Sequence, residues 1–337
     1  MTDNGAGQRF NAVGNPYPSP LNAVDFVSNT TNAANTTGTL YFWRKTNNAT
    51  SPSYCSWTTG GFVTNSEAQV FDPNDVLQTG QGFFVEASGN GTSLEFNNTM
   101  RIDDHANQFF RMQSTERHRI WLNATNAEGL FSQTLVGYMT NATNDVDYAI
   151  DGKHINDGAI ALTSLINDET FVIQGRSLPF ETTDVVPLQF KATSAGNYTI
   201  AIDHVDGLFL ESQPIYLRDL MMGVDHNLKV AEYNFTSDAG TFSNRFEIVY
   251  ESTLSVSNPI LENTVVVYSK NKTIEINSGS VPMNNVKVYD IRGRLVAEQN
   301  AAATTNISLP LERVANQVLI VQLTAVDGQT ISKKVVH

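Results

Sequence analysis

The last eighty or so residues form an unbroken series of short strands, and this feature constrains the fold most. From residue 257 onward, apolar and polar residues alternate in short runs that are separated by turn residues. A period of two residues places one face of each run on a core and the other towards solvent. We predict seven strands, near residues 263–269, 272–277, 285–290, 294–299, 304–309, 317–324 and 330–336. Seven such strands are typical of an immunoglobulin-like (Ig-like) sandwich, here without a disulfide because the stretch contains no cysteine.

Two turns in this series have distinct signatures. Asp290 to Arg294 forms a short loop in which Gly293 can adopt a positive φ, and the apolar run resumes at Leu295. Asp327-Gly328 separates the last two strands, and this dipeptide suits a tight hairpin turn. Both segments are therefore predicted hairpins.

The order of these elements resembles the type A C-terminal sorting domain of proteins that Bacteroidota export by type IX secretion. The likeness covers roughly residues 256–337. It rests on Asn258-Pro259, on Val288-Tyr289-Asp290 with Gly293-Arg294 and Val296, on an Ile-x-Leu strand that follows the hairpin, and on Asp327-Gly328 with Lys333-Lys334-Val335-Val336.

The resemblance implies a route and partners. Such a domain is recognised at the outer membrane by a barrel-type shuttle of the translocon, and a sortase-like peptidase usually removes it. The cargo is then released or attached to surface lipopolysaccharide. The residues expected to take part in recognition are Tyr289, Asp290, Gly293, Arg294, Asp327, Gly328, Lys333 and Lys334. The alternative is an ordinary Ig-like module in which the two lysines protect a sheet edge.

Charge and cysteine content exclude several classes of protein. The formal net charge of −13 disfavours binding to nucleic acid and to anionic membrane surfaces. Cys55 is the one cysteine, so no internal disulfide can form, and its position in an expected strand predicts a buried structural thiol. The first residues have neither a basic start nor an apolar core. Because a type IX cargo needs an export signal, we expect the chain to be the C-terminal piece of a longer protein.

The chain of 337 residues predicts three domains. These are a β-rich module with one short helix (1–113), a β-sandwich or jelly-roll-like module (114–254) and the Ig-like sorting domain (255–337). The fold class is all-β. The residues do not decide whether 1–254 form one core or two. Glu251–Ser257 is the expected linker and place of processing.

Several local elements follow from turn and cap signals. In the first module we expect a helix over Leu21–Ser28 capped by Ser19, a polar loop over Asn29–Gly38, a hairpin of Gly80–Ala87 with Ser93–Phe96, and a closing strand over Phe109–Met112. In the second module we expect Asn227–Phe235 and Arg245–Tyr250 to pair across residues 238–240.

No catalytic motif is present, and we predict that the chain is not an enzyme. Calcium is a better ion hypothesis than a metal at His204 or His226, because Asp145, Asp147 and Asp151, with Asp157 nearby, supply carboxylates in a single loop region. The alternative is a solvated acidic loop, and the same two interpretations apply to Asp203, Asp206 and Asp225.

Tyr41, Trp43 and Trp57 lie on or near expected strands and are candidates for a glycan platform. The alternative is that two of them fill the core and the third covers a sheet edge. The combined prediction is a secreted, cell-surface protein that reaches its location through a type IX signal. The other functions considered are a carbohydrate-binding or adhesive module (an adhesin) and the accessory region of a polysaccharide-degrading enzyme.

Overall fold

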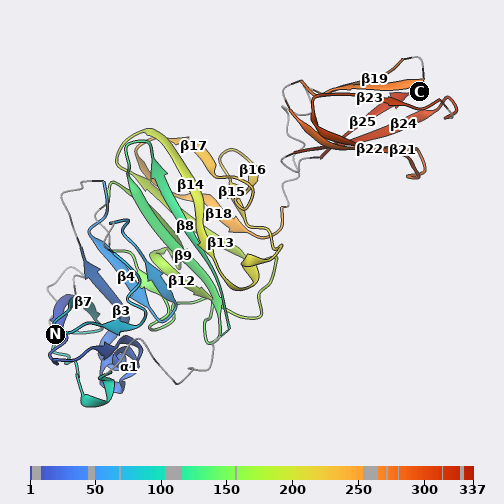
Figure 1. Cartoon of the computed structure of the whole chain (residues 1–337). Helices are drawn as coiled ribbons and strands as arrows, with labels where there is room; N and C mark the ends of the chain where they lie inside the picture. The colour runs from blue at the N-terminus through green and yellow to red at the C-terminus, as the bar shows by residue number, and fades with distance from the viewer. Residues whose placement is uncertain are drawn as a thin grey trace. The chain divides into compact units, whose positions relative to one another are not determined.

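The computed structural model describes residues 1, 9–44, 50–67, 70–102, 116–155, 158–252, 265–270, 272–279, 281–312, 314–326 and 330–337. The chain forms two compact units, Met1–Thr253 and Leu254–His337 (Figure 1). Both are built mainly from antiparallel sheets, so the predicted all-β class is confirmed. None of the helices within the described ranges has the length and hydropathy that crossing a bilayer requires.

The first unit begins with a five-stranded sheet in the order β1-β7-β3-β4-β5. Its strands are β1 (Phe10–Gly14), β3 (Thr36–Trp43), β4 (Tyr54–Thr58), β5 (Gly61–Val63) and β7 (Gly82–Ala87). Leu40 and Phe42 of β3 join Phe83 and Val85 of β7 in one buried cluster with Phe26. The alternation along each strand places these side chains on one face of the sheet.

Two short helices precede β3 in the chain, and the first of them packs on this face through Phe26 and Val27. They are α1 (Ala23–Ser28), which contains Phe26, and α2 (Thr30–Asn35), and they follow β2 (Leu21–Asn22), which pairs with β6 (Val76–Leu77). The predicted helix therefore starts two residues later than expected. Its cap is Asn22, whose side chain accepts a hydrogen bond from the Asp25 N–H at 3.0 Å, and not Ser19.

The polar loop predicted over Asn29–Gly38 is wrong, because α2 and the start of β3 occupy it. Asn29 caps α2 by accepting from the N–H groups of Thr31 and Asn32. The buried Asn32 side chain also bonds the backbone N–H and C=O of Glu95. These side-chain hydrogen bonds stabilise a helix that its Asn- and Thr-rich sequence does not favour.

The predicted hairpin of Gly80–Ala87 with Ser93–Phe96 is also wrong. β7 pairs with β1 on one side and with β3 on the other, and Ser93–Phe96 is not a strand. Both partners of β7 are more than forty residues away in the sequence, and no local turn signal specifies such pairing. A short 3₁₀ helix (Asn98–Met100) follows, and the strand expected over Phe109–Met112 lies outside the described residues.

The second sheet of this unit has eleven strands and forms a sandwich. Ten follow the order β16-β15-β18-β13-β11-β12-β9-β8-β14-β17, and β10 pairs with β12 off this path. The strands are β8 (Arg117–Asn126), β9 (Phe131–Met139), β10 (Gly152–Lys153), β11 (Ile160–Ile166), β12 (Glu169–Arg176), β13 (Val185–Ala192), β14 (Gly196–Val205), β15 (Tyr216–Asp219), β16 (Val224–Asn227), β17 (Tyr233–Ser237) and β18 (Gly240–Val249). A 3₁₀ helix (Gly207–Leu210) links β14 to β15.

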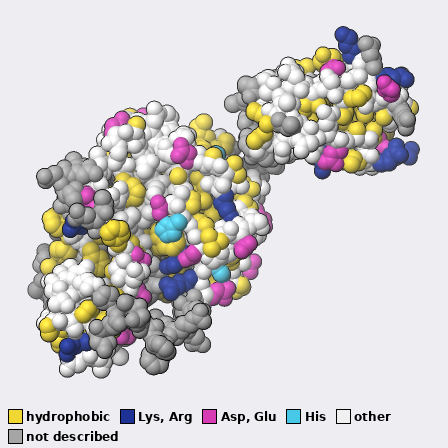
Figure 2. All heavy atoms as spheres, viewed as in Figure 1, with side chains coloured by type: hydrophobic (Ala, Val, Ile, Leu, Met, Phe, Trp, Pro, Cys, Tyr) yellow, Lys and Arg dark blue, Asp and Glu magenta, His cyan; other side chains and the backbone are white. Residues whose placement is uncertain are grey.

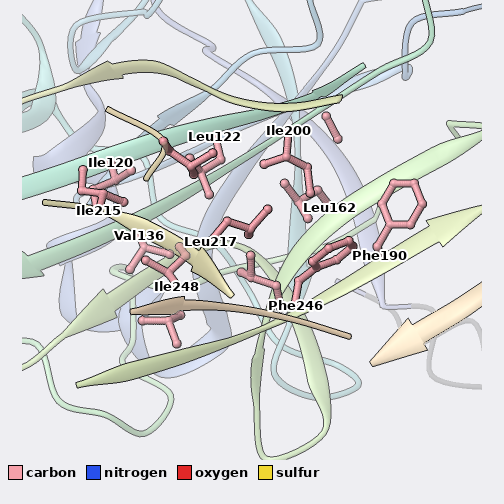
Figure 3. Packing of buried hydrophobic residues seen from close by; sticks show 14 of the residues in the cluster. Ile120, Leu122, Val136, Leu162, Phe190, Ile200, Ile215, Leu217, Phe246 and Ile248 are labelled. Atoms are coloured by element: carbon pink, nitrogen blue, oxygen red, sulfur yellow. The ribbon is translucent and has the colours of Figure 1, made fainter. Parts of the chain in front are cut away.

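The long sheet folds over so that its two halves enclose one core. Leu122 and Ile200, from β8 and β14, pack in the same cluster as Leu217 and Ile248, from β15 and β18 (Figure 3). All four side chains are fully buried. The sandwich predicted for this region is therefore present.

One predicted pairing inside the sandwich is wrong. β17 pairs with β14, and β18 pairs with β13 and β15, so no hairpin forms across residues 238–240. The chain instead passes from one half of the sandwich to the other at this turn. Phe235 of β17 and Phe246 of β18 meet across the core, with ring centroids 4.9 Å apart.

The five-stranded sheet and the sandwich belong to one compact unit, whereas we predicted a boundary after residue 113. Polar contacts join them directly. Trp121 of β8 donates its indole N–H to the Phe62 carbonyl at 2.8 Å, and Arg119 donates to the Gly60 carbonyl at 3.2 Å. Thr58 donates to the Ile150 carbonyl at 2.7 Å. The sheet and the sandwich have separate large hydrophobic clusters, with a small third cluster around Trp121.

The second unit is a seven-stranded sandwich, as predicted. One sheet has the order β19-β20-β23 and the other β22-β21-β24-β25. The strands are β19 (Val266–Lys270), β20 (Thr273–Asn277), β21 (Met283–Asp290), β22 (Leu295–Thr304), β23 (Asn306–Pro310), β24 (Val318–Ala325) and β25 (Thr330–Val336). Aliphatic side chains from both sheets form its core without a disulfide. The predicted linker lies mostly outside the described residues.

Candidate functional site

The β21–β22 hairpin of the second unit is organised by Asp290. Its carboxylate accepts from the backbone N–H groups of Arg292 and Arg294, at 2.9 and 3.0 Å, and from Arg294 Nε at 3.0 Å. These hydrogen bonds hold the pKa of Asp290 below its ordinary value. Gly293 has φ +79°, which a residue with a side chain rarely adopts. Asp290 and Gly293 therefore shape the turn, and the Arg294 side chain is exposed to solvent.

The strand register brings two of the predicted recognition residues into one row. Tyr289 of β21 lies opposite Ile320 of β24, and Ile320 lies opposite Lys334 of β25. On the other side, Leu295 of β22 lies opposite Tyr289. The row runs across the outer face of the four-stranded sheet, because the residues that flank Tyr289 and Ile320 along their strands are buried.

This outer face is apolar at the end of the sheet that carries the Asp290 turn. Val318 and Val336 lie opposite each other in the next row and are 40% and 75% exposed, and Leu295 is 48% exposed. We call Tyr289, Leu295, Val318, Ile320 and Val336 the terminal apolar face. Hydrophobic side chains are visible at the surface of this unit, with Lys and Arg side chains around them (Figure 2).

The two lysines that we predicted to take part in recognition do not lie on one face of the sheet. Lys333 and Lys334 point to opposite faces of β25, with Lys334 exposed and Lys333 half-buried on the side of Ile331 and Val335. The two lysines therefore do not form one continuous charged surface. Since β25 is an edge strand, an inward-facing Lys333 protects that edge from pairing with another chain. Asp327 and Gly328 lie outside the described residues.

A hollow at the end of β3 in the first unit contains two exposed aromatic side chains. It has a volume of about 290 Å³, and its lining includes Trp43, Phe71, Phe42 and Cys55. Trp43 is 58% exposed and Phe71 is 79% exposed. Tyr41 and Trp57 are buried, so two of the three candidate aromatics fill the core, and a platform of all three does not form. Phe71 was not among the predicted residues because it lies outside any strand.

The thiol of Cys55 lies at the bottom of this hollow. It is buried, as predicted, and donates to the Phe42 carbonyl at 3.3 Å. Burial raises the pKa of the thiol to about 12. The thiol is therefore protonated at neutral pH, which is the state of a structural cysteine.

Two of the carboxylates that we predicted to bind calcium accept hydrogen bonds from protein donors instead. The buried Asp151 carboxylate accepts from the Gly175 and Asp147 N–H groups, each at 2.6 Å, and burial raises its pKa to about 7. Asp147 accepts from the Thr143 N–H and hydroxyl. Within the described ranges no three His, Cys, Asp or Glu side chains are placed to hold a metal ion. Asp145, Asp147 and Asp151 are thus not assembled as a calcium site, and Asp157 lies outside those ranges.

The other acidic candidates are engaged with bases. Asp206 binds Arg119 through three hydrogen bonds, one from its backbone N–H and two from its guanidinium. Asp225 accepts from Arg218 at 2.8 Å. Asp203 contacts His204 Nδ1 at 2.6 Å, and the His204 ring stacks on Trp121 with centroids 3.9 Å apart. Asp206 and Asp225 are thus engaged in ion pairs, and Asp203 is held by His204 and by the Asn123 side chain.

Charge is distributed unequally between the two units. Residues 1–253 contain 13 Lys and Arg against 28 Asp and Glu, a formal charge of −15. Residues 254–337 contain 8 against 6, a formal charge of +2. The acidic character of the chain therefore belongs to the first unit alone.

Comparison with known proteins divides the chain as the structure does. Residues 1–250 match a family described as a domain of unknown function (DUF8693), and residues 254–337 match another, DUF8694. A search of the curated proteins gives no match. Among solved structures, the 47-kilodalton lipoprotein Tp47 of Treponema pallidum aligns over 82% of this chain and 70% of its own, at 9% identity and a TM-score of 0.23. That score is too low for an inference about fold or function.

Proposed function

The chain belongs to the DUF8693 family, and we propose that it is an exported cell-surface protein whose last domain, residues 254–337, is a type IX sorting signal. In this proposal the first unit is cargo and carries out no catalysis. The partner of the last domain is the shuttle protein of the outer-membrane translocon. A sortase-like peptidase then cuts within the linker, Glu251–Ser257.

The terminal apolar face is the observation that carries the proposal. Leu295, Val318 and Val336 expose apolar surface on the same four-stranded sheet, where most strands of a soluble domain present polar side chains. Such a surface is stabilised by contact with a partner. Lys334 at one end of its row adds a positive charge, so the matching surface on the partner would be apolar with an acidic border.

The hairpin supports the same interpretation. The Asp290 turn fixes the start of β22 and therefore the place of Leu295 beside Tyr289. In this view Asp290 and Gly293 act through the shape of the turn, and Tyr289, Leu295, Arg294 and Lys334 make the contacts. The likeness to sorting domains noted in the sequence involves both groups of residues.

The test is export of the full chain, with an added export signal, in a Bacteroidota host. Leu295→Glu combined with Val336→Glu places two charges on the terminal apolar face without touching the core. We expect this variant to stay in the periplasm. The matched control is Val266→Glu, which changes a 56%-exposed valine on the opposite sheet and should leave export intact. Equal export of all three proteins, each with unchanged melting, would refute the role of the face.

A further inference from the structure

The hollow beside Trp43, which we call the aromatic groove, is built differently from the rest of the surface of the first unit. Its floor is formed by Phe42, Cys55 and Phe62, and the exposed rings of Trp43 and Phe71 lie at its sides. Trp43 ends β3, and Gly82, which begins β7 in the neighbouring strand, also lines the groove. Since Gly82 has no side chain, nothing from that position covers the indole ring.

Exposure on this scale is unusual for such residues in this chain. The other two tryptophans, Trp57 and Trp121, are 2% and 5% exposed. Burial of an indole or phenyl ring contributes a large favourable free energy, and a ring that stays in water does not gain it. Two such rings at one small groove therefore indicate a ligand that covers them.

We propose that the aromatic groove binds one or two sugar units of a neutral glycan, with sugar faces stacked on Trp43 and Phe71. A pyranose ring has an apolar C–H face and a rim of hydroxyl groups, so it needs aromatic rings and hydrogen-bonding side chains at the same place. The groove offers both. A volume of about 290 Å³ is at the lower end for ligand sites, which fits a short part of a longer chain.

The polar side of the groove is formed by Gln81 and Arg44. The Gln81 side-chain oxygen accepts from the Gln78 N–H at 2.8 Å, which fixes the amide and leaves its two N–H donors for hydroxyl oxygens. Arg44 follows Trp43 in the chain and also lines the groove. Both side chains are donors, which suits the acceptor oxygens of a sugar.

Charge distinguishes a neutral glycan from other ligands. The first unit has a formal charge of −15, which disfavours acidic polysaccharides and lipid phosphates. A wholly apolar ligand such as a fatty acid would leave the donors of Gln81 unpaired. The inference concerns the first unit and does not depend on how the chain is exported.

Tryptophan fluorescence provides a selective test, because Trp43 is the exposed indole among the three. The full chain is titrated with neutral hexasaccharides of β-glucose, β-xylose and β-mannose, with oligogalacturonate as an anionic comparison and a C12 fatty acid as an apolar one. We expect at least one neutral hexasaccharide to shift the emission to shorter wavelength at millimolar concentration or below, and the other two ligands to have no effect.

Substitutions distinguish ligand binding itself from the fluorescence change that reports it. Trp43→Phe keeps a ring for stacking, so calorimetric binding should persist while the fluorescence change disappears. Trp43→Ala and Phe71→Ala should each weaken binding about tenfold. Met221→Ala, at a 63%-exposed apolar residue elsewhere in the unit, is the control and should bind as the unchanged protein does. Melting curves confirm that each variant is folded.

Three results would overturn the proposal. The first is the absence of binding by every neutral hexasaccharide at 10-millimolar concentration, on the order of the weakest specific affinities. The second is unchanged affinity after Trp43→Ala. The third is binding of the fatty acid or of oligogalacturonate alone, which would assign the groove to an apolar or an acidic ligand.

Discussion

Arg294 donates both its backbone N–H and its side-chain Nε–H to the carboxylate of Asp290, each at 3.0 Å. The two residues thus close the β21–β22 turn from both sides, with Gly293 in a positive-φ conformation between them. The Asp-x-x-Gly-Arg pattern in the sequence is accounted for by this turn. The residues that a partner would contact are those that the turn positions.

The first prediction concerns pH. The pKa of Asp290 is lowered in the folded state, so its contribution to stability is present above the unfolded pKa of about 3.9 and is lost as the pH falls through the folded value. We expect the protection of the β21 and β22 amides against hydrogen exchange, relative to their intrinsic rates, to fall below about pH 4. Asp290→Ala should give fast exchange at pH 7 already. Equal exchange in both proteins at pH 7 would contradict the role of the carboxylate.

A second prediction concerns the buried ion pair of the first unit. Asp219 accepts from Arg245 Nε and Nη2 at 3.2 and 3.1 Å, and both side chains are almost fully buried. Removing one partner leaves a buried charge, so Asp219→Ala or Arg245→Ala should each lower the free energy of unfolding by about 3–5 kcal/mol. The double variant should lose less free energy of unfolding than the two single variants lose together.

Urea denaturation followed by tryptophan fluorescence measures this effect, because all three tryptophans lie in the first unit. Arg218→Ala is a comparison in the adjacent, less buried pair with Asp225 and Glu247 and should cost less. Strict additivity of the Asp219 and Arg245 substitutions would show that the two side chains are not coupled.

The third prediction concerns the core of the second unit. Leu323 of β24 is fully buried among the aliphatic side chains of both sheets. Leu323→Ala should therefore lower the free energy of unfolding of this unit by about 2–5 kcal/mol. Val326→Ala, at a 57%-exposed position three residues on, should change it by less than about 0.5 kcal/mol. Circular dichroism resolves the transition, and equal effects of both substitutions would place the core elsewhere.

The terminal strands were predictable from the sequence because their pairing is largely local. All seven begin within three residues of the expected position, since turns such as Asp290–Arg294 lie between neighbours in the sequence. Local signals failed where β7 pairs with β1 and β3, and where β17 and β18 lie in opposite halves of the sandwich. Such pairings depend on segments far apart in the chain.

The candidate sites also depend on contacts that local sequence signals do not specify. The row from Leu295 to Lys334 follows from strand register, which the sequence pattern leaves open. Phe71 lies in a loop and meets Trp43 only in the folded unit. A signal was nevertheless present: an apolar Val70-Phe71 pair directly before Asp72-Pro73, where a loop would ordinarily be polar.

A fourth prediction concerns calcium. Because the Asp147 and Asp151 carboxylates accept hydrogen bonds from Thr143, Gly175 and the Asp147 N–H, their oxygens are already engaged by local donors. We expect the melting temperature of the first unit to be the same in millimolar calcium and in chelator. A calcium-dependent increase that Asp147→Asn removes would show that the loop rearranges to bind the ion.

The central claim is that residues 254–337 direct export, and transfer of the signal tests it most directly. These residues form a compact unit of their own and can be fused to a fluorescent protein that carries an export signal, in a Bacteroidota host. The comparison is the same fusion without residues 328–337. We predict that the intact fusion reaches the surface or the medium and that the truncated one stays in the periplasm. Retention of both in the periplasm would contradict the claim and identify the domain as an ordinary sandwich module.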